Sequence, residues 1–117
     1  MNGLSYLLDT NIIIGLLRGN PEAIARLAGI DSPSCAYSAI TRMELLSFPD
    51  LTDVEAAFIR QLLEPMTYLA VSQIIEERTI EFRHLHRVKL PDAIIAATAQ
   101  THGLQLLTLD KKLAARL

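Results

Sequence analysis

Four acidic residues could do chemistry together: Asp9, Glu44, Asp92 and Asp110. Asp9 and Asp110 stand where a strand-like segment gives way to a helical one. Glu44 lies about two turns into the helical segment after the second strand, and Asp92 lies in the first turn of a later helical segment. Carboxylates that are brought together repel one another, and a hard divalent cation is the usual remedy. All-oxygen ligation suits Mg²⁺ or Mn²⁺, which can orient a water, promote its ionisation and stabilise the charge that grows on a phosphodiester. If these acids converge, they predict phosphodiester hydrolysis with Mg²⁺ or Mn²⁺ as the cofactor.

Each acid also has an ordinary structural explanation. Asp9 and Asp110 are placed as helix N-caps, and Asp92 in a first helical turn would complement the helix dipole. Glu44 could lie on a solvated helix face. The functional interpretation is favoured because Glu44 has apolar neighbours on both sides, and because Asp9 and Asp92 sit among apolar residues where an uncompensated charge would be costly.

The rest of the chain alternates strand-like and helical segments. We predict strands at 4–8, 34–37, 66–71 and 104–108, and helices over 11–19, 22–28, 39–46, 52–64, 72–89, 90–102 and from 110 onward. Such alternation predicts an α/β fold with a central parallel sheet between two helical layers. Because the strand-to-helix junctions of parallel strands share one edge, the four acids would meet there.

Length and composition bound the possibilities. A chain of 117 residues is expected to form one domain over 1–117. Its hydrophobic content of 50% predicts an apolar surface patch covered by a dimer mate or another partner. With a net charge of −2, nucleic acid would have to be held by a local basic patch or by metal ions. The absence of Trp argues against base-stacking platforms.

Cysteine use and hydropathy indicate the compartment. The single cysteine, Cys35, allows no intramolecular disulfide, which suits a reducing environment. No apolar run approaches the roughly 20 residues of a membrane-spanning helix, and the N-terminus lacks the pattern of a signal peptide. We therefore expect a cytoplasmic protein that makes no membrane contact.

Four segments in this order resemble a PIN domain of the VapC toxin type: LDTN at 8–11, SAITRMEL at 38–45, LPDAIIAATA at 90–99 and LTLD at 107–110. The resemblance covers nearly the whole chain. It implies a three-layer α/β/α PIN-like fold and a Mg²⁺- or Mn²⁺-dependent endoribonuclease that leaves a 3′-hydroxyl and a 5′-phosphate. It further implies the toxin of a type II toxin–antitoxin pair, usually a homodimer, inhibited by an antitoxin that occludes or invades the active site.

The resemblance also implies roles for single residues. The family's metal-binding acids match Asp9, Glu44 and Asp92, and the polar positions that support them match Thr10, Asn11 and Thr108.

Asp110 departs from the family pattern. Related toxins often have Thr-Arg-Asn in this region and an Asp three residues after the Asn, where this chain has Leu113. Asp110 itself matches the position of the Asn. It is therefore either a substitute fourth acid, or the site uses three.

Cations gather just before the segment that contains Asp92: Arg83, His84, His86, Arg87 and Lys89. Arg87 and Lys89, with Arg42, are candidates for contacts to RNA phosphates. The alternative is that the cluster stabilises the C-terminal end of its own helix. The two histidines are two residues apart, which places them on different helix faces and argues against zinc.

Two other functions compete with the nuclease. An aspartyl-phosphate enzyme could use Asp9, but that chemistry would want a second acid where this chain has Asn11. A catalytically inactive PIN-like module could serve as a binding partner or scaffold. A degenerate copy is expected to have lost one of Asp9, Glu44 and Asp92, and this sequence retains all three.

Overall fold

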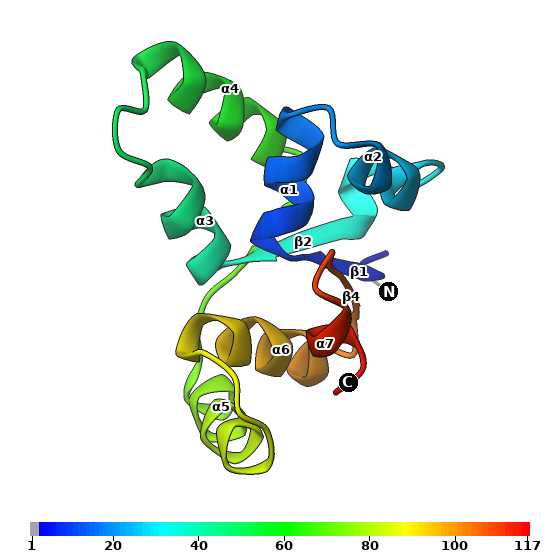
Figure 1. Cartoon of the computed structure of the whole chain (residues 1–117), viewed down its shortest axis with the longest axis vertical. Coiled ribbons are helices and arrows are strands. Elements are labelled where there is room, and N and C mark those ends of the chain that lie inside the picture. Colours follow the sequence, from blue (N-terminus) through cyan, green and yellow to red (C-terminus); the bar gives the residue numbers. More distant parts are fainter. Residues whose placement is uncertain (1–2) are drawn as a thin grey trace.

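The computed structural model describes residues 3–117 and contains a parallel four-stranded sheet with helices on both faces (Figure 1). The strands lie in the order β3-β2-β1-β4. In chain order the elements are β1 (Tyr6–Leu8), α1 (Thr10–Leu17), α2 (Pro21–Leu27), a 3₁₀ turn (Ser32–Ser34), β2 (Cys35–Ser38), α3 (Ala39–Leu46), α4 (Asp53–Leu63), β3 (Thr67–Leu69), α5 (Gln73–Leu85), α6 (Leu90–His102), β4 (Gln105–Leu107) and α7 (Lys111–Ala114).

Every predicted strand and helix is present, and two of them are clearly shorter than predicted. The strand expected over 66–71 is reduced to β3, which lies at the edge of the sheet and pairs only with β2. The helix expected over 72–89 ends at Leu85, and residues 86–89 connect it to α6. The helix ends there because His86 has an extended backbone, with φ −134° and ψ 142°. Within residues 3–117, no helix has the length and apolarity to cross a membrane.

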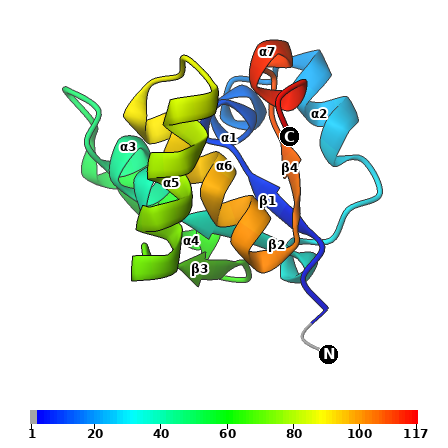
Figure 2. The ribbon, with the colours of Figure 1, turned by 90° about the horizontal axis from the view of Figure 1, so that it is seen from below.

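The two faces of the sheet have separate cores. Leu7, Ala36 and Leu106 pack with α5, α6 and α7, whereas Leu8 and Leu107 pack with α1, α3 and α4. This division follows from the alternation of side chains along each strand. Figure 2 shows α5 and α6 lying across the first of these faces. The three-layer α/β/α fold and the parallel central sheet are thereby confirmed.

The alanine-rich face of α6 brings that helix close to the sheet. Ala93, Ala96 and Ala99 are almost fully buried in the same core as the strand residues Leu7 and Leu106. Small side chains permit this close approach. The first turn of α6, which carries Asp92, is thereby held beside the sheet.

The carboxyl ends of β1 and β4 are in register. Leu8 pairs with Leu107, and the Asp9 N–H donates to the Leu107 carbonyl at 2.9 Å. Asp9 and Thr108 therefore leave neighbouring strands at the same level.

Helices α1 and α2 touch at a glycine, which provides a test of packing at some distance from the acids. A Cβ added to Gly15 would lie 2.7 Å from the Ala23 Cβ. Gly15→Ala is therefore expected to cost about 1–3 kcal/mol of unfolding free energy through overpacking. Urea denaturation would measure the loss, and Gly15→Ala/Ala23→Gly should recover part of it. A Gly15→Ala variant as stable as the wild type would show that the two helices separate freely.

Candidate active site

Asp9 is buried at the end of β1, with 5% of its surface exposed. It is the N-cap of α1, and its Oδ1 accepts from the Thr10 N–H at 2.7 Å. Its Oδ2 accepts from the Thr108 hydroxyl at 2.7 Å. Burial raises the pKa of Asp9, the two hydrogen bonds oppose that rise, and the charges of Asp92 and Glu44 add to it. The fold therefore holds this carboxylate in a fixed orientation at an energetic cost.

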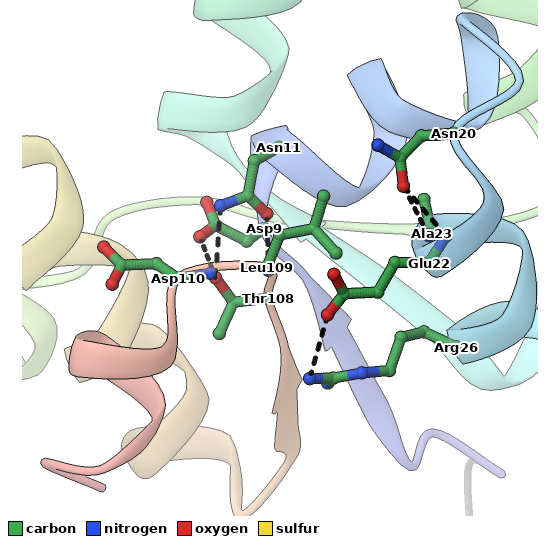
Figure 3. A network of polar contacts seen from close by, with 9 residues as sticks. All are labelled: Asp9, Asn11, Asn20, Glu22, Ala23, Arg26, Thr108, Leu109 and Asp110. Carbon is green, nitrogen blue, oxygen red and sulfur yellow. Dashed lines mark hydrogen bonds and ion pairs between the residues drawn. The ribbon is translucent and has the colours of Figure 1, made fainter.

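Thr108 links Asp9 to the start of α7 (Figure 3). Besides donating to Asp9, its hydroxyl accepts from Asn11 Nδ2 at 3.2 Å and from the Asp110 N–H at 3.0 Å. The Asn11 Oδ1 accepts from the Leu109 N–H at 3.0 Å. Asn11 and Thr108 thus fasten the β4–α7 junction to α1.

Glu44 reaches the same edge from α3, although its side chain is largely exposed. Its Oε1 accepts from the Thr10 hydroxyl at 2.6 Å. The apolar sequence neighbours of Glu44 suggested a more enclosed position. Of them, Leu45 faces the core, whereas Met43 is 54% exposed. Glu44 therefore lies at the open mouth of the site, fixed by Thr10.

The sequence analysis missed the buried hydroxyls behind Thr10. The Thr41 hydroxyl lies 3.0 Å from that of Thr10 and 3.4 Å from that of Ser38. Thr41 is fully buried. The signal was available, because Thr41 lies three residues after the helix cap Ser38 and three before Glu44, on one helix face.

Asp92 comes from the other side of the sheet. It lies in the first turn of α6 and is partly buried. Burial raises its pKa, and the charges of Asp110 and Glu44 raise it further, whereas the charge of Lys89 lowers it. These electrostatic effects place Asp92 near Asp110, Glu44 and Lys89.

Asp110 has a structural role as well as a place in this cluster. Its Oδ1 accepts from the Leu113 N–H at 3.1 Å, which makes it the N-cap of α7. The capping role considered from the sequence is therefore present. Its charge also acts on Asp92, so capping does not remove Asp110 from the electrostatics of the site.

The four acids have oxygen donors of the kind that bind a hard divalent cation, but they do not form a complete binding site in this structure. Within residues 3–117, no three acidic, histidine or cysteine side chains stand close enough to hold one cation together. In that part of the chain, none of the four acids forms an ion pair with Lys or Arg. Their oxygen donors suit Mg²⁺, which keeps several waters and commonly takes only one or two carboxylates directly.

The three cations predicted to contact RNA lie in two places. Arg42 is on α3, where its charge opposes the burial that raises the pKa of Tyr37. Arg87 and Lys89 lie in the connection between α5 and α6. The alternative, that the cluster stabilises the C-terminal end of its own helix, fits Arg83 and His84 in the last turn of α5, whereas Arg87 and Lys89 lie beyond that helix.

The raised pKa of Asp92 leads to a prediction about stability. Because folding raises the pKa of Asp92, its charged form lowers the stability of the folded state. This loss of stability is absent below about pH 4, where Asp92 is protonated, and complete once the pH exceeds the pKa of Asp92 in the folded state. Asp92→Asn is therefore expected to raise the thermal midpoint in EDTA at pH 7, with the gain disappearing towards pH 4. Thermal unfolding at both pH values would measure the change in midpoint. An unchanged midpoint at pH 7 would show that the charge of Asp92 does not destabilise the fold.

Comparisons with known proteins show which family the chain belongs to. A family model of the PIN domain matches residues 6–116. Among solved structures, the chain is similar to a toxin–antitoxin complex from Klebsiella pneumoniae, at 39% identity, covering 92% of this chain and 88% of that one, with a TM-score of 0.82. It is also similar to VapBC-1 from nontypeable Haemophilus influenzae, at 25% identity, covering 97% and 92%, with a TM-score of 0.78. A DNA-bound VapBC from Salmonella typhimurium matches at 26% identity, covering 86% and 83%, with a TM-score of 0.74.

A search of curated proteins finds no match. The PIN domain match nevertheless spans all the candidate site residues, from Asp9 to Asp110. The resemblance to VapC-type toxins is confirmed by the VapBC complexes among the structural neighbours. The chain belongs to the PIN domain family.

Proposed function

We propose that this protein is a metal-dependent endoribonuclease and the toxin of a toxin–antitoxin pair. The observation that carries the proposal is that Asp9, Glu44 and Asp92, which are far apart in the chain, lie near enough for the charges of Glu44 and Asp92 to raise the pKa of Asp9. The hydrogen bond from Thr10, the residue after Asp9, to Glu44 places Glu44 at the same edge of the sheet. Keeping these charges together costs stability, and hydrogen bonds from Thr10 and Thr108 hold two of them in place. Such an arrangement is typical of a site that binds a cation and a phosphate.

The roles of the residues follow from their contacts. Asp9, Glu44 and Asp92 would hold Mg²⁺ or Mn²⁺, and Asp110 would add negative charge beside Asp92. When bound, such an ion promotes ionisation of a water and stabilises the charge that develops on the phosphodiester. Thr108 directs the Oδ2 of Asp9.

Asp92 has the least constrained carboxylate of the three. In residues 3–117 its side chain takes part in no hydrogen bond, whereas each of the other two accepts at least one. It therefore has the greatest freedom to turn towards an incoming ion.

An apolar groove beside the acids supports the antitoxin part of the proposal. A cavity of about 400 Å³ is lined by Ile14 and Leu17 of α1 and by Phe48 and Phe58 from the α3–α4 region. Ile14 and Phe48 also line the cavity at Glu44. An amphipathic helix of an antitoxin laid in this groove would therefore end beside the acids and block access to them.

A homodimer is also part of the proposal. Large apolar side chains remain exposed on α4 and α5, among them Val54 at 80%, Ile74 at 61% and Leu85 at 78%. Exposed apolar surface of this kind is commonly covered by a partner. Sedimentation of the purified chain would test the dimer separately from the nuclease.

Cleavage of total RNA tests the nuclease directly. Purified protein, shown to be folded and free of antitoxin, is incubated with Mg²⁺, Mn²⁺ or EDTA beside the Asp9→Asn variant. We expect discrete products with either metal, none in EDTA and none from the variant. Sequencing the product ends would identify the RNA and check the 3′-hydroxyl and 5′-phosphate.

Failure would have a definite meaning. If folded protein cleaves no RNA under any condition, calorimetry with Mn²⁺ decides between an unsuitable substrate and a non-catalytic module. Absence of Mn²⁺ uptake, or uptake unchanged by Asp9→Asn, would favour the scaffold function.

A further inference from the structure

The connection between α5 and α6 lines a cavity of about 680 Å³. Its titratable lining residues are all basic: Arg83, His84, His86, Arg87 and Lys89. The arginines and the lysine supply three positive charges on a chain whose net charge is −2. Because the chain as a whole is acidic, this local concentration of cations is a feature that selects anions.

The backbone of this connection is fixed, while its cations remain available. Arg83 Nε donates to the Val88 carbonyl at 3.3 Å, and Arg116 Nη1 donates to the Arg87 carbonyl at 3.2 Å. In residues 3–117, neither Arg87 nor Lys89 forms an ion pair or a side-chain hydrogen bond. Both side chains are exposed. They are therefore free to contact a ligand from a rigid support.

The cavity adjoins the acidic edge. Lys89 is the N-cap of α6 and precedes Asp92 by three residues, which is about one helical turn. The positive charge of Lys89 lowers the pKa of Asp92, against the rise caused by burial. A polyanion that entered the acidic edge would therefore pass Lys89.

We propose that this cavity binds a backbone phosphate of single-stranded RNA, next to the phosphate that lies at Asp92. The inference rests on the proposed nuclease function and adds to it a place where the substrate strand is held. Arg87 and Lys89 would contact the phosphate, and the apolar side chains of Ile80 and Leu90, which also line the cavity, would contact the adjoining sugar or base. The acidic edge repels phosphate when no metal is bound, so this cavity supplies attraction that the acids cannot.

The experiment measures RNA binding in EDTA, where cleavage does not interfere. Fluorescence anisotropy of a labelled oligouridylate is followed for the wild type, Arg87→Gln/Lys89→Gln and the control Arg26→Gln/Arg60→Gln. The control removes the same amount of charge from exposed positions on α2 and α4, in the opposite helical layer. We expect about a tenfold weaker affinity for the first variant only. The slope of log affinity against log salt concentration should become shallower by about 0.7 for each phosphate that the variant can no longer bind.

The outcomes separate this inference from the nuclease function. Equal losses in both double variants would show a general charge effect and overturn the inference. If Arg87→Gln/Lys89→Gln leaves RNA binding unchanged and the protein still cleaves RNA with metal, the phosphate site in the cavity is overturned and the nuclease function is retained. Specific loss of binding from protein that neither cleaves RNA nor takes up Mn²⁺ would support phosphate binding in the cavity and overturn the nuclease function.

Discussion

RNA cleavage is expected to fall by roughly a thousandfold or more when Asp92 is replaced by asparagine. The amide keeps the shape of the side chain but removes the charge that would hold Mg²⁺ or Mn²⁺. Because Asp92 takes part in no side-chain hydrogen bond within residues 3–117, the substitution breaks no part of the supporting network. Loss of cleavage with retained or increased stability would separate a functional carboxylate from a structural one. Initial rates of cleavage at saturating Mg²⁺ give the measurement.

Asp9→Asn and Glu44→Gln are expected to reduce cleavage to a similar degree. The control is Asp53→Asn, which neutralises an acid in the first turn of α4. The control should cleave like the wild type. Any of the three site variants that did the same would lose its place among the metal-binding residues.

Thr108→Val is expected to destabilise the protein by on the order of 3 kcal/mol, because its hydroxyl serves three partners in a buried position. Valine is close to threonine in shape, so the loss reports hydrogen bonds rather than volume. Asp9 would lose a donor, and the N–H groups of Asn11 and Asp110 would lose an acceptor. Without the hydroxyl, the pKa of Asp9 would rise further. Cleavage should fall by about 10–100-fold as Asp9 loses its orientation.

Two controls bracket this result. Thr108→Ser keeps the hydroxyl and should retain most of the stability and activity. Thr98→Val removes an equally buried hydroxyl that donates only to the Ile94 carbonyl within α6, and it should cost much less. Urea denaturation in EDTA gives the free energies of unfolding. If Thr98→Val lowered the free energy of unfolding as much as Thr108→Val, the hydrogen bonds around Asp9 would contribute no more to stability than a single buried hydrogen bond.

The order and type of the elements could be predicted from the sequence alone. Alternation of short apolar runs with helical segments indicates parallel strands, and the parallel pairing of β1 with β2 and β4 confirms this. The helix caps were also local signals: Ser38, Thr52 and Ser72 each accept from a backbone N–H three residues later. Such features depend on neighbouring residues, so they can be recognised without the fold.

The C-terminal end of α5 was harder to predict from the sequence. The cluster from Arg83 to Lys89 continues a helical pattern in sequence, yet α5 stops at Leu85. The chain leaves α5 at His86, whose backbone is extended, and residues 86–89 contain no glycine or proline that would signal this end. The cluster of cations is visible in the sequence, whereas the cavity that it lines is formed by the connection between two packed helices.

The sequence by itself determined which residues carry charge and which strands end at them, and this placed Asp9, Glu44, Asp92 and Asp110 near one edge. Only the tertiary structure decided how they differ: Asp9 is buried between two donors, Glu44 is exposed beside Thr10, and Asp110 caps α7. The physical reason is that burial and hydrogen bonding are set by contacts between residues up to 99 positions apart, as between Asp9 and Thr108. Spacing in the chain predicts where a strand ends, whereas side-chain partners are chosen by packing across the sheet.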